Sequence, residues 1–310
     1  MIDRLSPLSD LVLSGPGIDR SAHRRGDEQW LAQRWADPRS RVLLVADGEA
    51  ATEPDADPPG IQLGWQSPDS IVGGERYLLG VDGDDRALFA VRLDELPADR
   101  QPKNIRELAA RIDPSQAALL VHAVALANWH ASHPFCPRCG GVTDVALAGA
   151  ERRCTVDGTS HFPRTDPAVI VLVTDPSERA LLGRQRTWPP GRFSTLAGFV
   201  EPGEAAEQAV VREVNEESGL TVTDVRYLGS QPWPFPASLM LGFAASSSGK
   251  DPVADGEELE EVRWFSRADL ASAIQAGDVV APGGISISRR LIERWYGGVL
   301  PSGPPGLGWR

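Results

Sequence analysis

The chain has 310 residues and a formal net charge of −12, and 41% of its residues are hydrophobic. This length suggests two domains, or three modules, with sizeable cores. The negative charge argues against broad electrostatic binding to nucleic acid, because phosphate contacts normally need a basic surface.

The N-terminal sequence MIDRLSPLSDLVLSG lacks a basic segment followed by a long apolar run, and no stretch of the chain is long enough to cross a bilayer. Three cysteines, two of them in a CxxC motif, do not suggest a disulfide framework and fit a reducing compartment. We therefore expect a soluble, cytoplasmic protein.

Residues 1–130 alternate candidate strands, such as 41–46 and 75–81, with helical segments, which predicts an N-terminal α+β domain. Near its end, residues 104–112 and 115–133 both have helical periodicity. His122 and His130 lie on the second of these segments. They are most simply packed or surface histidines, because a metal site needs partners at defined spacing.

Residues 131–163 carry a candidate zinc-binding module. Cys136 and Cys139 form a CxxC followed by glycine, which is half of a zinc knuckle, and Cys154 supplies a third thiolate. Asp157 and His161 are the candidates for the fourth ligand. The alternative is that these cysteines are reduced core residues without zinc.

From Asp166 onward the pattern is strand, turn, strand, and more strand-like segments follow at 221–231, 238–246 and 260–266. Two helices are expected near the end, at 267–276 and 285–296. This pattern predicts an α/β/α sandwich with a mixed sheet over residues 164–298, followed by a flexible tail at 299–310.

Residues 198–220, with the sequence GFVEPGEAAEQAVVREVNEESGL, combine a turn with an acidic helix. Pro202 and Gly203 turn the chain, and good helix formers then run from about residue 205 to Gly219. The helical period places acidic and apolar side chains on adjoining stripes, and we expect the valines to be buried and the glutamates not. The glutamates are Glu213, Glu216 and Glu217, and the valines are Val210, Val211 and Val214.

Like charges at helical spacing repel one another, so the three glutamates make most sense if a divalent cation neutralises them. Magnesium or manganese leaves coordination sites for water and phosphate oxygens, which suits hydrolysis of a diphosphate. The alternative is an acidic amphipathic surface helix, as found in many soluble proteins.

Residues 230–238, SQPWPFPAS, alternate three prolines with two aromatic residues. Prolines at this spacing are incompatible with a helix or a central strand, so a stiff loop is expected. Such a loop would present Trp233, Phe235 and the amide of Gln231 to a flat heterocycle. A polyproline ligand or an ordinary rigid turn is the alternative.

The order of residues from Gly198 to Leu220 fills every fixed position of the Nudix box, so the chain resembles the Nudix hydrolases. With the cysteine knuckle before the box and SQPWPFPAS after it, residues 100–295 look like the NADH pyrophosphatase subfamily. The resemblance implies an α/β/α Nudix sandwich preceded by a zinc ribbon and an N-terminal α+β domain. It also implies that Arg212 pairs with Glu204.

The resemblance further implies site residues. Glu213, Glu216 and Glu217 are expected to be catalytic, and which of them is the general base stays open. The Mg²⁺ or Mn²⁺ ligands are expected to be these glutamates, the Ala197 carbonyl and Glu258. Relatives commonly carry a second CxxC whose final cysteine is replaced here by Asp157, which makes Asp157 the first choice for the fourth Zn²⁺ ligand. The expected substrate contacts are Arg106, Phe162, Phe199, Gln231, Pro232, Trp233, Pro234, Phe235, Pro236, Ala237, Ser238 and Ser288.

The implied reaction is hydrolysis of the pyrophosphate bond of NADH or NAD to AMP and the nicotinamide mononucleotide. Removal of NAD caps from RNA 5′ ends is a second implied activity, and a homodimer is the implied assembly. One alternative is a Nudix hydrolase that prefers ADP-ribose or dinucleoside polyphosphates. Another is a non-catalytic nucleotide-sensing module, against which the intact glutamates argue.

Overall fold

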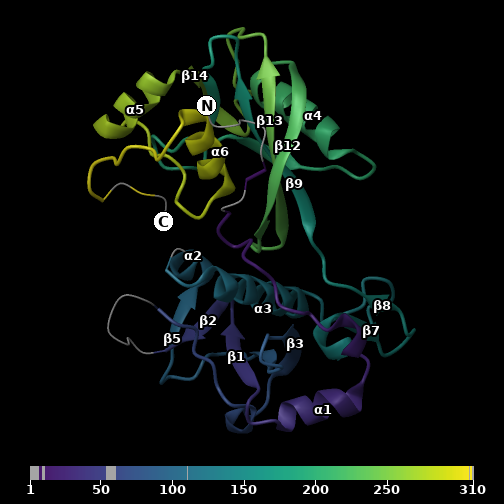
Figure 1. Ribbon diagram of the computed structural model, residues 1–310. Helices are drawn as coiled ribbons and strands as arrows, with labels where there is room; N and C mark the ends of the chain where they lie inside the picture. The colour runs from purple at the N-terminus through teal and green to yellow at the C-terminus, as the bar shows by residue number, and fades with distance from the viewer. Residues whose placement is uncertain (1–6, 9–10, 54–60, 110, 307, 309–310) are drawn as a thin grey trace. The chain divides into compact units, whose positions relative to one another are not determined.

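The structure, a computed structural model, describes residues 7–8, 11–53, 61–109, 111–306 and 308 (Figure 1). The chain divides into two compact units. The first contains the described residues of Met1–Val12, Asp166–Pro232 and Ser238–Arg310. The second contains those of Leu13–Thr165 and Trp233–Ala237.

The first unit is built on a six-stranded mixed sheet with the strand order β12-β13-β9-β10-β14, and β11 also pairs with β9. Strand β13 runs parallel to β9, whereas β10 and β11 run antiparallel to it. The strands are β9 (Asp166–Thr174), β10 (Ala180–Gln185), β11 (Leu196–Phe199), β12 (Val222–Trp233), β13 (Ser238–Ser247) and β14 (Leu259–Phe265).

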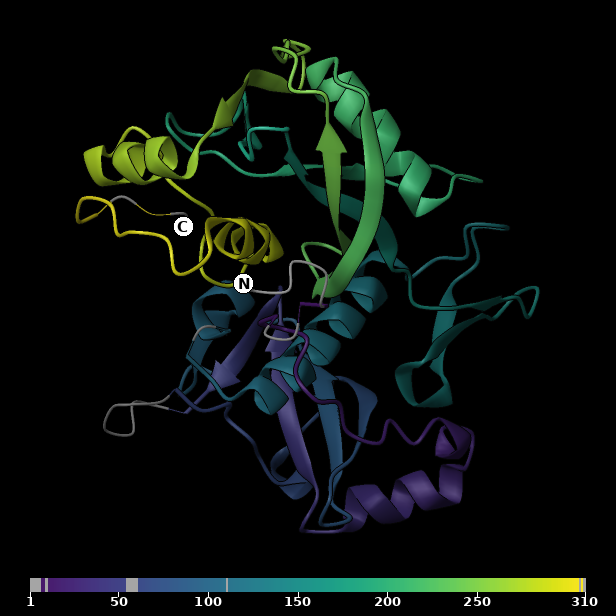
Figure 2. The ribbon, with the colours of Figure 1, turned by 45° about the horizontal axis from the view of Figure 1, so that its top comes forward.

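Helices cover both faces of this sheet, because successive side chains of β9 point to opposite sides. Val169 and Val171 pack in one core cluster with residues of α4, and Ile170 and Leu172 pack in another with residues of α5 and α6. Figures 1 and 2 show this division of the helices. The helices are α4 (Ala206–Ser218), α5 (Arg267–Ala276) and α6 (Ile287–Tyr296). The expected three-layer sandwich is therefore present.

Residues near the N-terminus complete this unit. Leu11 is buried in the core cluster that contains α5 and α6. The Leu8 N–H donates a hydrogen bond of 2.6 Å to the carbonyl of Leu228 in β12. The first unit thus combines segments from both ends of the chain.

The second unit contains a five-stranded sheet with the order β3-β4-β1-β2-β5, in which β1 and β4 are parallel. The expected strands at 41–46 and 75–81 are β1 and β3, so that prediction is confirmed. Helix α3 contacts β1, β2 and β3, and Figure 2 shows it lying along the sheet. The elements are α1 (Glu28–Ala36), β1 (Arg41–Ala46), β2 (Glu49–Thr52), β3 (Glu75–Val81), β4 (Ala87–Arg92), β5 (Gln101–Asn104), α2 (Ile105–Leu108), α3 (Pro114–Ser132) and the 3-10 helices η1 (Ala22–Arg24) and η2 (Pro68–Ser70).

A small antiparallel sheet follows α3 in the same unit. It contains β6 (Thr143–Ala146), β7 (Glu151–Cys154) and β8 (Ser160–His161), and the 3-10 helix η3 (Leu147–Gly149) joins the first two strands. We call residues 131–163 the ribbon. Its short strands place the CxxC turn and the β7–β8 hairpin next to each other.

The prediction that residues 230–238 form a loop throughout is wrong. Strand β12 continues to Trp233 and β13 begins at Ser238, so only residues 234–237 form the turn. Pro232 is tolerated in a strand because β12 lies at the edge of the sheet, where a strand makes ladder hydrogen bonds on one side only.

The C-terminal residues 299–306 form no helix or strand, and residues 307, 309 and 310 of the expected tail lie outside the described residues. In the part of the chain that the structure describes, no helix is both long enough and apolar enough to span a membrane.

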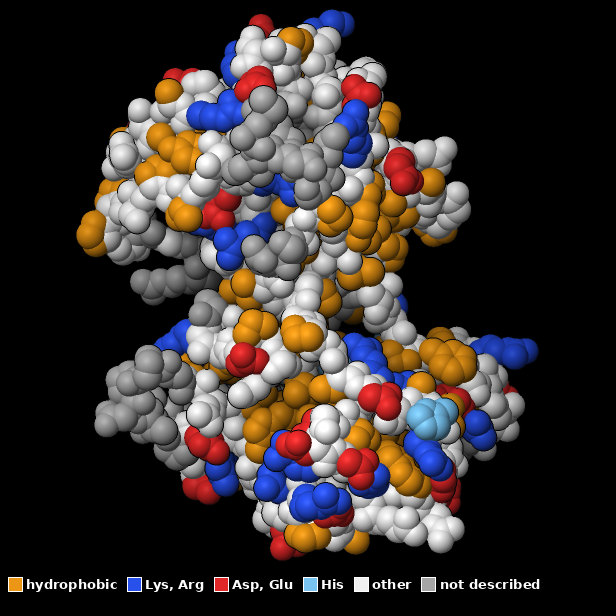
Figure 3. Space-filling model, in the orientation of Figure 1, with side chains coloured by type: hydrophobic (Ala, Val, Ile, Leu, Met, Phe, Trp, Pro, Cys, Tyr) orange, Lys and Arg blue, Asp and Glu red, His pale blue; other side chains and the backbone are white. Residues whose placement is uncertain are grey.

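Acidic and basic side chains are interspersed on the surface of the second unit. On the face shown in Figure 3, Lys and Arg lie among Asp and Glu over this unit. Ion pairs such as Arg34–Asp85 at 2.8 Å and Arg86–Asp82 at 2.8 Å join opposite charges there. Among the described residues on this face of the second unit, basic side chains therefore alternate with acidic ones.

Candidate active site

The acidic helix has the bounds that its sequence predicts. Gly203 has a φ of 86°, which lets the chain turn before the helix, and Gly219 ends it with a φ of 67°. The Ala205 N–H donates to the Gln208 side chain at 3.2 Å, which satisfies one donor at the helix start. Both ends of helix α4 are thus fixed, which sets the positions of its glutamates.

The burial of this helix corrects the expectation from the sequence. Val210 and Val214 are fully buried, but Val211 is 38% exposed because it faces away from the sheet. Glu213 and Glu217 are only 8% and 3% exposed. They pack against the backbone of β11, where the absence of a side chain at Gly198 makes room for the Glu213 carboxylate: a Cβ there would lie 2.0 Å from it.

Glu217 has an unsatisfied oxygen in this site. Among the described residues, its Oε2 atom is buried and has no hydrogen-bond partner. Burial raises the pKa of Glu217 to about 8, and the charges of Glu213, Glu258 and Asp255 add to this shift, whereas a backbone hydrogen bond from Ala197 opposes it. Carboxylates crowd together here without enough positive charge nearby.

Arg212 is the cation of the site, and it binds the carboxylates beside it. Its Nε and Nη2 atoms donate to the two Glu204 oxygens, each at 2.8 Å, which confirms the predicted pair. Its Nη1 donates to Glu213 at 2.8 Å and to Glu216 at 2.9 Å, and its Nη2 also reaches the Phe199 carbonyl at 2.8 Å. The hydrogen bonds from Arg212 lower the pKa of Glu204 to about 2. Arg212 therefore fixes the loop before α4 to the helix.

Asp255 stabilises the loop that carries Glu258 through hydrogen bonds to its backbone. Its carboxylate accepts hydrogen bonds from the backbone N–H groups of Leu259 at 2.9 Å, Glu258 at 3.2 Å and Glu257 at 3.3 Å. Sequence reasoning missed this residue. An aspartate followed by glycine, as in DGEE, is a signal for such side-chain-to-backbone turns and could have found it.

The residues present fit a hard divalent cation. Glu213, Glu216, Glu217 and Glu258 offer carboxylate oxygens, the type of ligand that Mg²⁺ and Mn²⁺ prefer. Among the described residues, however, only the ribbon cluster has its ligand atoms gathered within 4.8 Å of one another. A cation among the glutamates would give the buried Oε2 of Glu217 the partner it lacks. Burial, together with neighbouring negative charges, raises the pKa values of both Glu213 and Glu217, and a cation would offset both causes.

Gln231 and Ser288, expected as substrate contacts, lie inside the first unit. Gln231 is fully buried; its Nε2 donates to the carbonyls of Val12 and Ile285, and its Oε1 accepts the Ile287 N–H at 2.8 Å. Ser288 is 1% exposed and hydrogen-bonds to other hydroxyl groups. The side-chain polar atoms of both residues therefore form hydrogen bonds with other groups of the protein.

Three of the expected contact residues come together in the second unit. The rings of Trp233 and Phe235 meet edge to face, with centroids 5.1 Å apart. The Arg106 guanidinium lies 4.4 Å from the Phe235 centroid and 5.9 Å from that of Trp233. Arg106 therefore contacts the turn that contains Trp233 and Phe235. The residues around Arg106 in the sequence do not indicate this contact.

The other expected contacts differ in exposure. Phe162 is 64% exposed on the second unit, and Phe199 is 58% exposed on the first. Of the remaining residues in the turn, Pro234 is buried and Pro236 is exposed. Pro232, Ala237 and Ser238 are partly buried.

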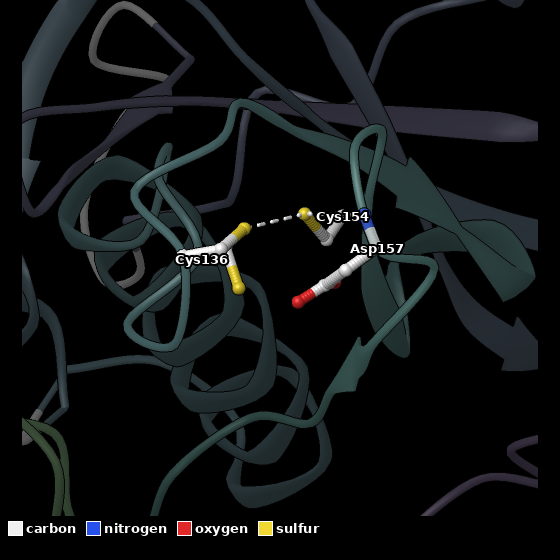
Figure 4. Close-up of side chains that lie close together, drawn as sticks. Cys136, Cys154 and Asp157 are labelled. Atoms are coloured by element: carbon white, nitrogen blue, oxygen red, sulfur yellow. Dashed lines mark hydrogen bonds between the residues drawn. The ribbon is translucent and has the colours of Figure 1, made fainter.

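The ribbon forms a metal-binding knuckle from residues far apart in sequence. Ligand atoms of Cys136, Cys139, Cys154 and Asp157 all lie within 4.8 Å of one another. Figure 4 shows Cys136, Cys154 and Asp157 pointing toward one another. The sulfurs of Cys139 and Cys154 lie 3.4 Å apart. Three sulfurs and an oxygen at this spacing fit tetrahedral Zn²⁺.

Of the two candidates for the fourth ligand, Asp157 lies in the cluster of ligand atoms and His161 lies beside it. The Thr159 N–H donates to the Asp157 carboxylate at 2.9 Å and holds the pKa of Asp157 below its usual range. His161 lies outside the set of four and places its Nε2 3.2 Å from the Cys136 sulfur. That is the position of an outer hydrogen-bond partner to a ligand.

Three family models match the chain in series. They describe an NADH pyrophosphatase-like rudimentary NUDIX domain at residues 38–129, an NADH pyrophosphatase zinc ribbon domain at 131–162 and a NUDIX domain at 164–282. Their order confirms the predicted fold class, in which an N-terminal domain and a zinc ribbon precede the Nudix sandwich.

Curated relatives match nearly the whole chain. The NAD-capped RNA hydrolase NudC of Mycobacterium bovis is 41% identical over 306 residues, which cover 92% of this chain and 94% of that protein. The protein of the same name from Mycobacterium tuberculosis is 40% identical with the same coverage. The human NAD-capped RNA hydrolase NUDT12 is 30% identical, covering 90% of this chain and 71% of that protein. The chain is thus an enzyme of the Nudix hydrolases and belongs to their NADH pyrophosphatase family.

Proposed function

We propose that this enzyme hydrolyses the pyrophosphate bond of NADH and NAD, giving AMP and the nicotinamide mononucleotide, and that it removes NAD caps from RNA 5′ ends. The observation that carries the proposal is the buried, unpartnered Glu217 oxygen within a cluster of carboxylates. Relatives named NAD-capped RNA hydrolases support the choice of substrate.

The proposed Mg²⁺ or Mn²⁺ ligands are Glu213, Glu216, Glu217, Glu258 and the carbonyl of Ala197. When bound, the cations would neutralise the diphosphate and lower the pKa of a water for attack on phosphorus. Glu213 and Glu217 would hold them from one face of α4. Glu216, exposed beside them, can accept a proton from water, although any of the three glutamates can act as general base.

Arg212 has a supporting role in this scheme. Its bonds to Glu204 and to the Phe199 carbonyl tie the preceding loop to α4, so the glutamates keep one geometry. Asp255 does the same for the loop of Glu258. Both residues would lower the cost of ordering the site when substrate binds.

The aromatic residues are the proposed substrate contacts. Trp233 and Phe235, backed by Arg106, offer faces on which a base can stack. Phe162 and Phe199, each more than half exposed, offer further faces. The contacts expected from the remainder of residues 231–238 and from Ser288 stay predictions.

We further propose structural Zn²⁺ in the ribbon, with Asp157 as the fourth ligand, and a division into 1–130, 131–163, 164–298 and a tail at 299–310. The four clustered ligand atoms support the zinc site. A homodimer in the cytoplasm completes the proposal, in line with the family resemblance and the reduced state of the three cysteines.

One steady-state panel tests the reaction. Hydrolysis of NADH, NAD, ADP-ribose and NAD-capped RNA is compared at equal concentration with Mg²⁺ or Mn²⁺. Highest kcat/KM for the NAD compounds is expected. A clear preference for ADP-ribose would overturn the substrate assignment.

A matched pair of variants tests the site. Glu217→Gln should abolish most turnover, whereas Glu207→Gln, on the exposed first turn of the same helix, should retain it. Unchanged turnover in Glu217→Gln would reject the catalytic assignment. An inactive wild type that binds nucleotides tightly would favour the nucleotide-sensing alternative.

A further inference from the structure

A cluster of buried hydroxyl groups joins the start of α6 to the chain just before β11. The Ser288 Oγ lies 2.8 Å from the Ser194 Oγ and 2.8 Å from the Thr195 Oγ1, and it accepts the Thr195 N–H at 3.1 Å. A serine hydroxyl has one hydrogen to donate and two lone pairs. These three contacts use that capacity, and all three residues are buried.

Gln231 fixes the position of Ser288 from the other side. Its Oε1 accepts the Ile287 N–H at 2.8 Å, and its Nε2 donates to the Ile285 carbonyl at 2.7 Å. Ile285 and Ile287 lie within three residues of Ser288, the first just before α6 and the second at its first position. One amide from β12 thus sets the start of α6, and one hydroxyl from α6 holds Thr195.

Thr195 leads directly into the strand on which the carboxylates rest. Ala197, two residues further on, lies close enough to Glu217 for its backbone to oppose the rise in the pKa of that carboxyl group. Gly198 follows, and the Glu213 carboxylate packs against its Cα so closely that any side chain would collide with it. A shift of Thr195 would therefore move the surface that positions both glutamates.

We propose that Ser288 and Gln231 are positioning residues for the cation site, acting through Thr195 on β11. The inference rests on the proposed function, because it assumes that Glu213 and Glu217 bind a divalent cation. Neither side chain touches the reacting atoms in this assignment. The Ser288 hydroxyl and the Gln231 amide fix the position of the β11 backbone against which the carboxylates pack.

Binding of Mn²⁺ to the substrate-free enzyme, followed by electron paramagnetic resonance and calorimetry, tests the proposal. The variants are Ser288→Ala, the nearly isosteric Thr195→Val and the double variant. Each single change should weaken Mn²⁺ binding on the order of tenfold, as changes behind metal ligands commonly do. The double variant should bind Mn²⁺ no more weakly than Ser288→Ala, because Ser288→Ala already removes every side-chain bond between Ser288 and Thr195, whereas Thr195→Val leaves the bond from the Thr195 N–H.

Ser286→Ala is the matched control. The Ser286 Oγ caps the same helix by accepting the Ser288 N–H at 3.2 Å, but no bond joins it to Thr195 among the described contacts. Its loss should lower the unfolding temperature while leaving Mn²⁺ affinity within about twofold of wild type. Gln231→Glu keeps an oxygen for the Ile287 N–H but loses two donated bonds, and it should weaken Mn²⁺ binding as Ser288→Ala does.

Two results would overturn the inference while the proposed function stands. One is a Ser288→Ala enzyme that binds Mn²⁺ as tightly as Ser286→Ala, and the other is a double variant whose loss equals the sum of the single losses. If wild type and Glu217→Gln bind Mn²⁺ equally, the cation site itself is wrong and the proposed function falls with the inference.

Discussion

The Arg152 guanidinium lies 3.0 Å from the Nδ1 atom of His130 and joins the ribbon to helix α3. A guanidinium can only donate, so Nδ1 accepts and the ring proton resides on Nε2, which donates to the Gly149 carbonyl at 2.9 Å. Burial lowers the pKa of His130 to about 4, and the charge of Arg152 adds to this, which keeps the ring neutral. The packed histidine expected at this position therefore has a defined structural role.

Replacing Arg152 should destabilise the second unit. Arg152 is 5% exposed and also bonds to Glu75 at 3.2 Å and to the side chain and carbonyl of Thr143. Arg152→Met would leave these buried acceptors unpaired, at a cost of about 3 kcal/mol. Urea unfolding followed by circular dichroism measures the loss.

The neighbouring Arg153 is the control for that variant. Its side chain is 58% exposed and pairs with Glu151 at 3.0 Å. An ion pair with one exposed partner contributes about 0 to 1 kcal/mol, so Arg153→Met should change stability little. If Arg152→Met and Arg153→Met lowered the free energy of unfolding equally, the buried hydrogen bonds of Arg152 would contribute no more to stability than an exposed ion pair.

Removal of Asp157 should release the proposed zinc ion. Asp157→Ala deletes the only oxygen ligand of the four-residue cluster, so zinc content and the absorption of the Co²⁺-substituted protein should both fall. His161→Ala should keep the metal, because His161 lies beside a ligand rather than among the four. The reverse outcome, with metal lost only in His161→Ala, would make the histidine the ligand. Elemental analysis of both variants decides between them.

Glu217 should make the stability of the metal-free enzyme depend on pH. Its pKa is raised from 4.5 to about 8, first by burial and then by the charges of nearby acids. Between these values the folded chain holds a proton that the unfolded chain has released. The free energy of unfolding should therefore fall as the pH rises from about 4.5 to about 8, and level off above.

Urea unfolding of wild type and Glu217→Gln over this pH range measures the effect as a difference. The amide does not titrate, so the variant should lack this part of the fall. Mn²⁺ should reduce the fall in wild type, because a bound cation stabilises the ionised carboxylate. Parallel pH profiles for the two metal-free proteins would contradict the burial of this carboxyl group.

Arg106 should affect binding of NADH more than turnover. Its contact with Phe235 at 4.4 Å orients the ring pair, and a cation–π contact contributes about 0.5 to 2 kcal/mol. Arg106→Ala should raise KM by about 3- to 30-fold with kcat nearly unchanged, the signature of lost uniform binding. Arg111→Ala, an exposed arginine nearby, serves as control. An unchanged KM in Arg106→Ala would remove Arg106 from the substrate contacts.

Local signals in the sequence predicted the bounds of the acidic helix well. The turn at Pro202 and Gly203 and the stop at Gly219 predict a helix from about residue 205, and α4 spans Ala206–Ser218. Glycine and proline act on the backbone next to them, so their effects can be predicted without the tertiary structure.

Properties set by sheet order could not be predicted in this way. The prolines of SQPWPFPAS suggested a loop, yet Pro232 lies in β12 because that strand is at an edge. The burial of Glu217 likewise depends on β11, which the helical period does not reveal. The partners of Gln231 and Ser288 are Val12 and Thr195, 219 and 93 residues away. Such contacts exist only once the strands are ordered.

The placement of Leu8, Leu11 and Val12 in the first unit affects the order in which the enzyme can fold during synthesis. These residues leave the ribosome before the rest of the first unit, but the Val12 carbonyl cannot receive its hydrogen bond until Gln231, 219 residues later, has been made. The residues of the second unit emerge in between, almost entirely as one block, and can fold earlier. Closing so long a loop costs little more conformational entropy than closing a shorter one, but it slows folding. The core of the first unit is therefore completed late, when residues made long before the rest of that unit pack into it.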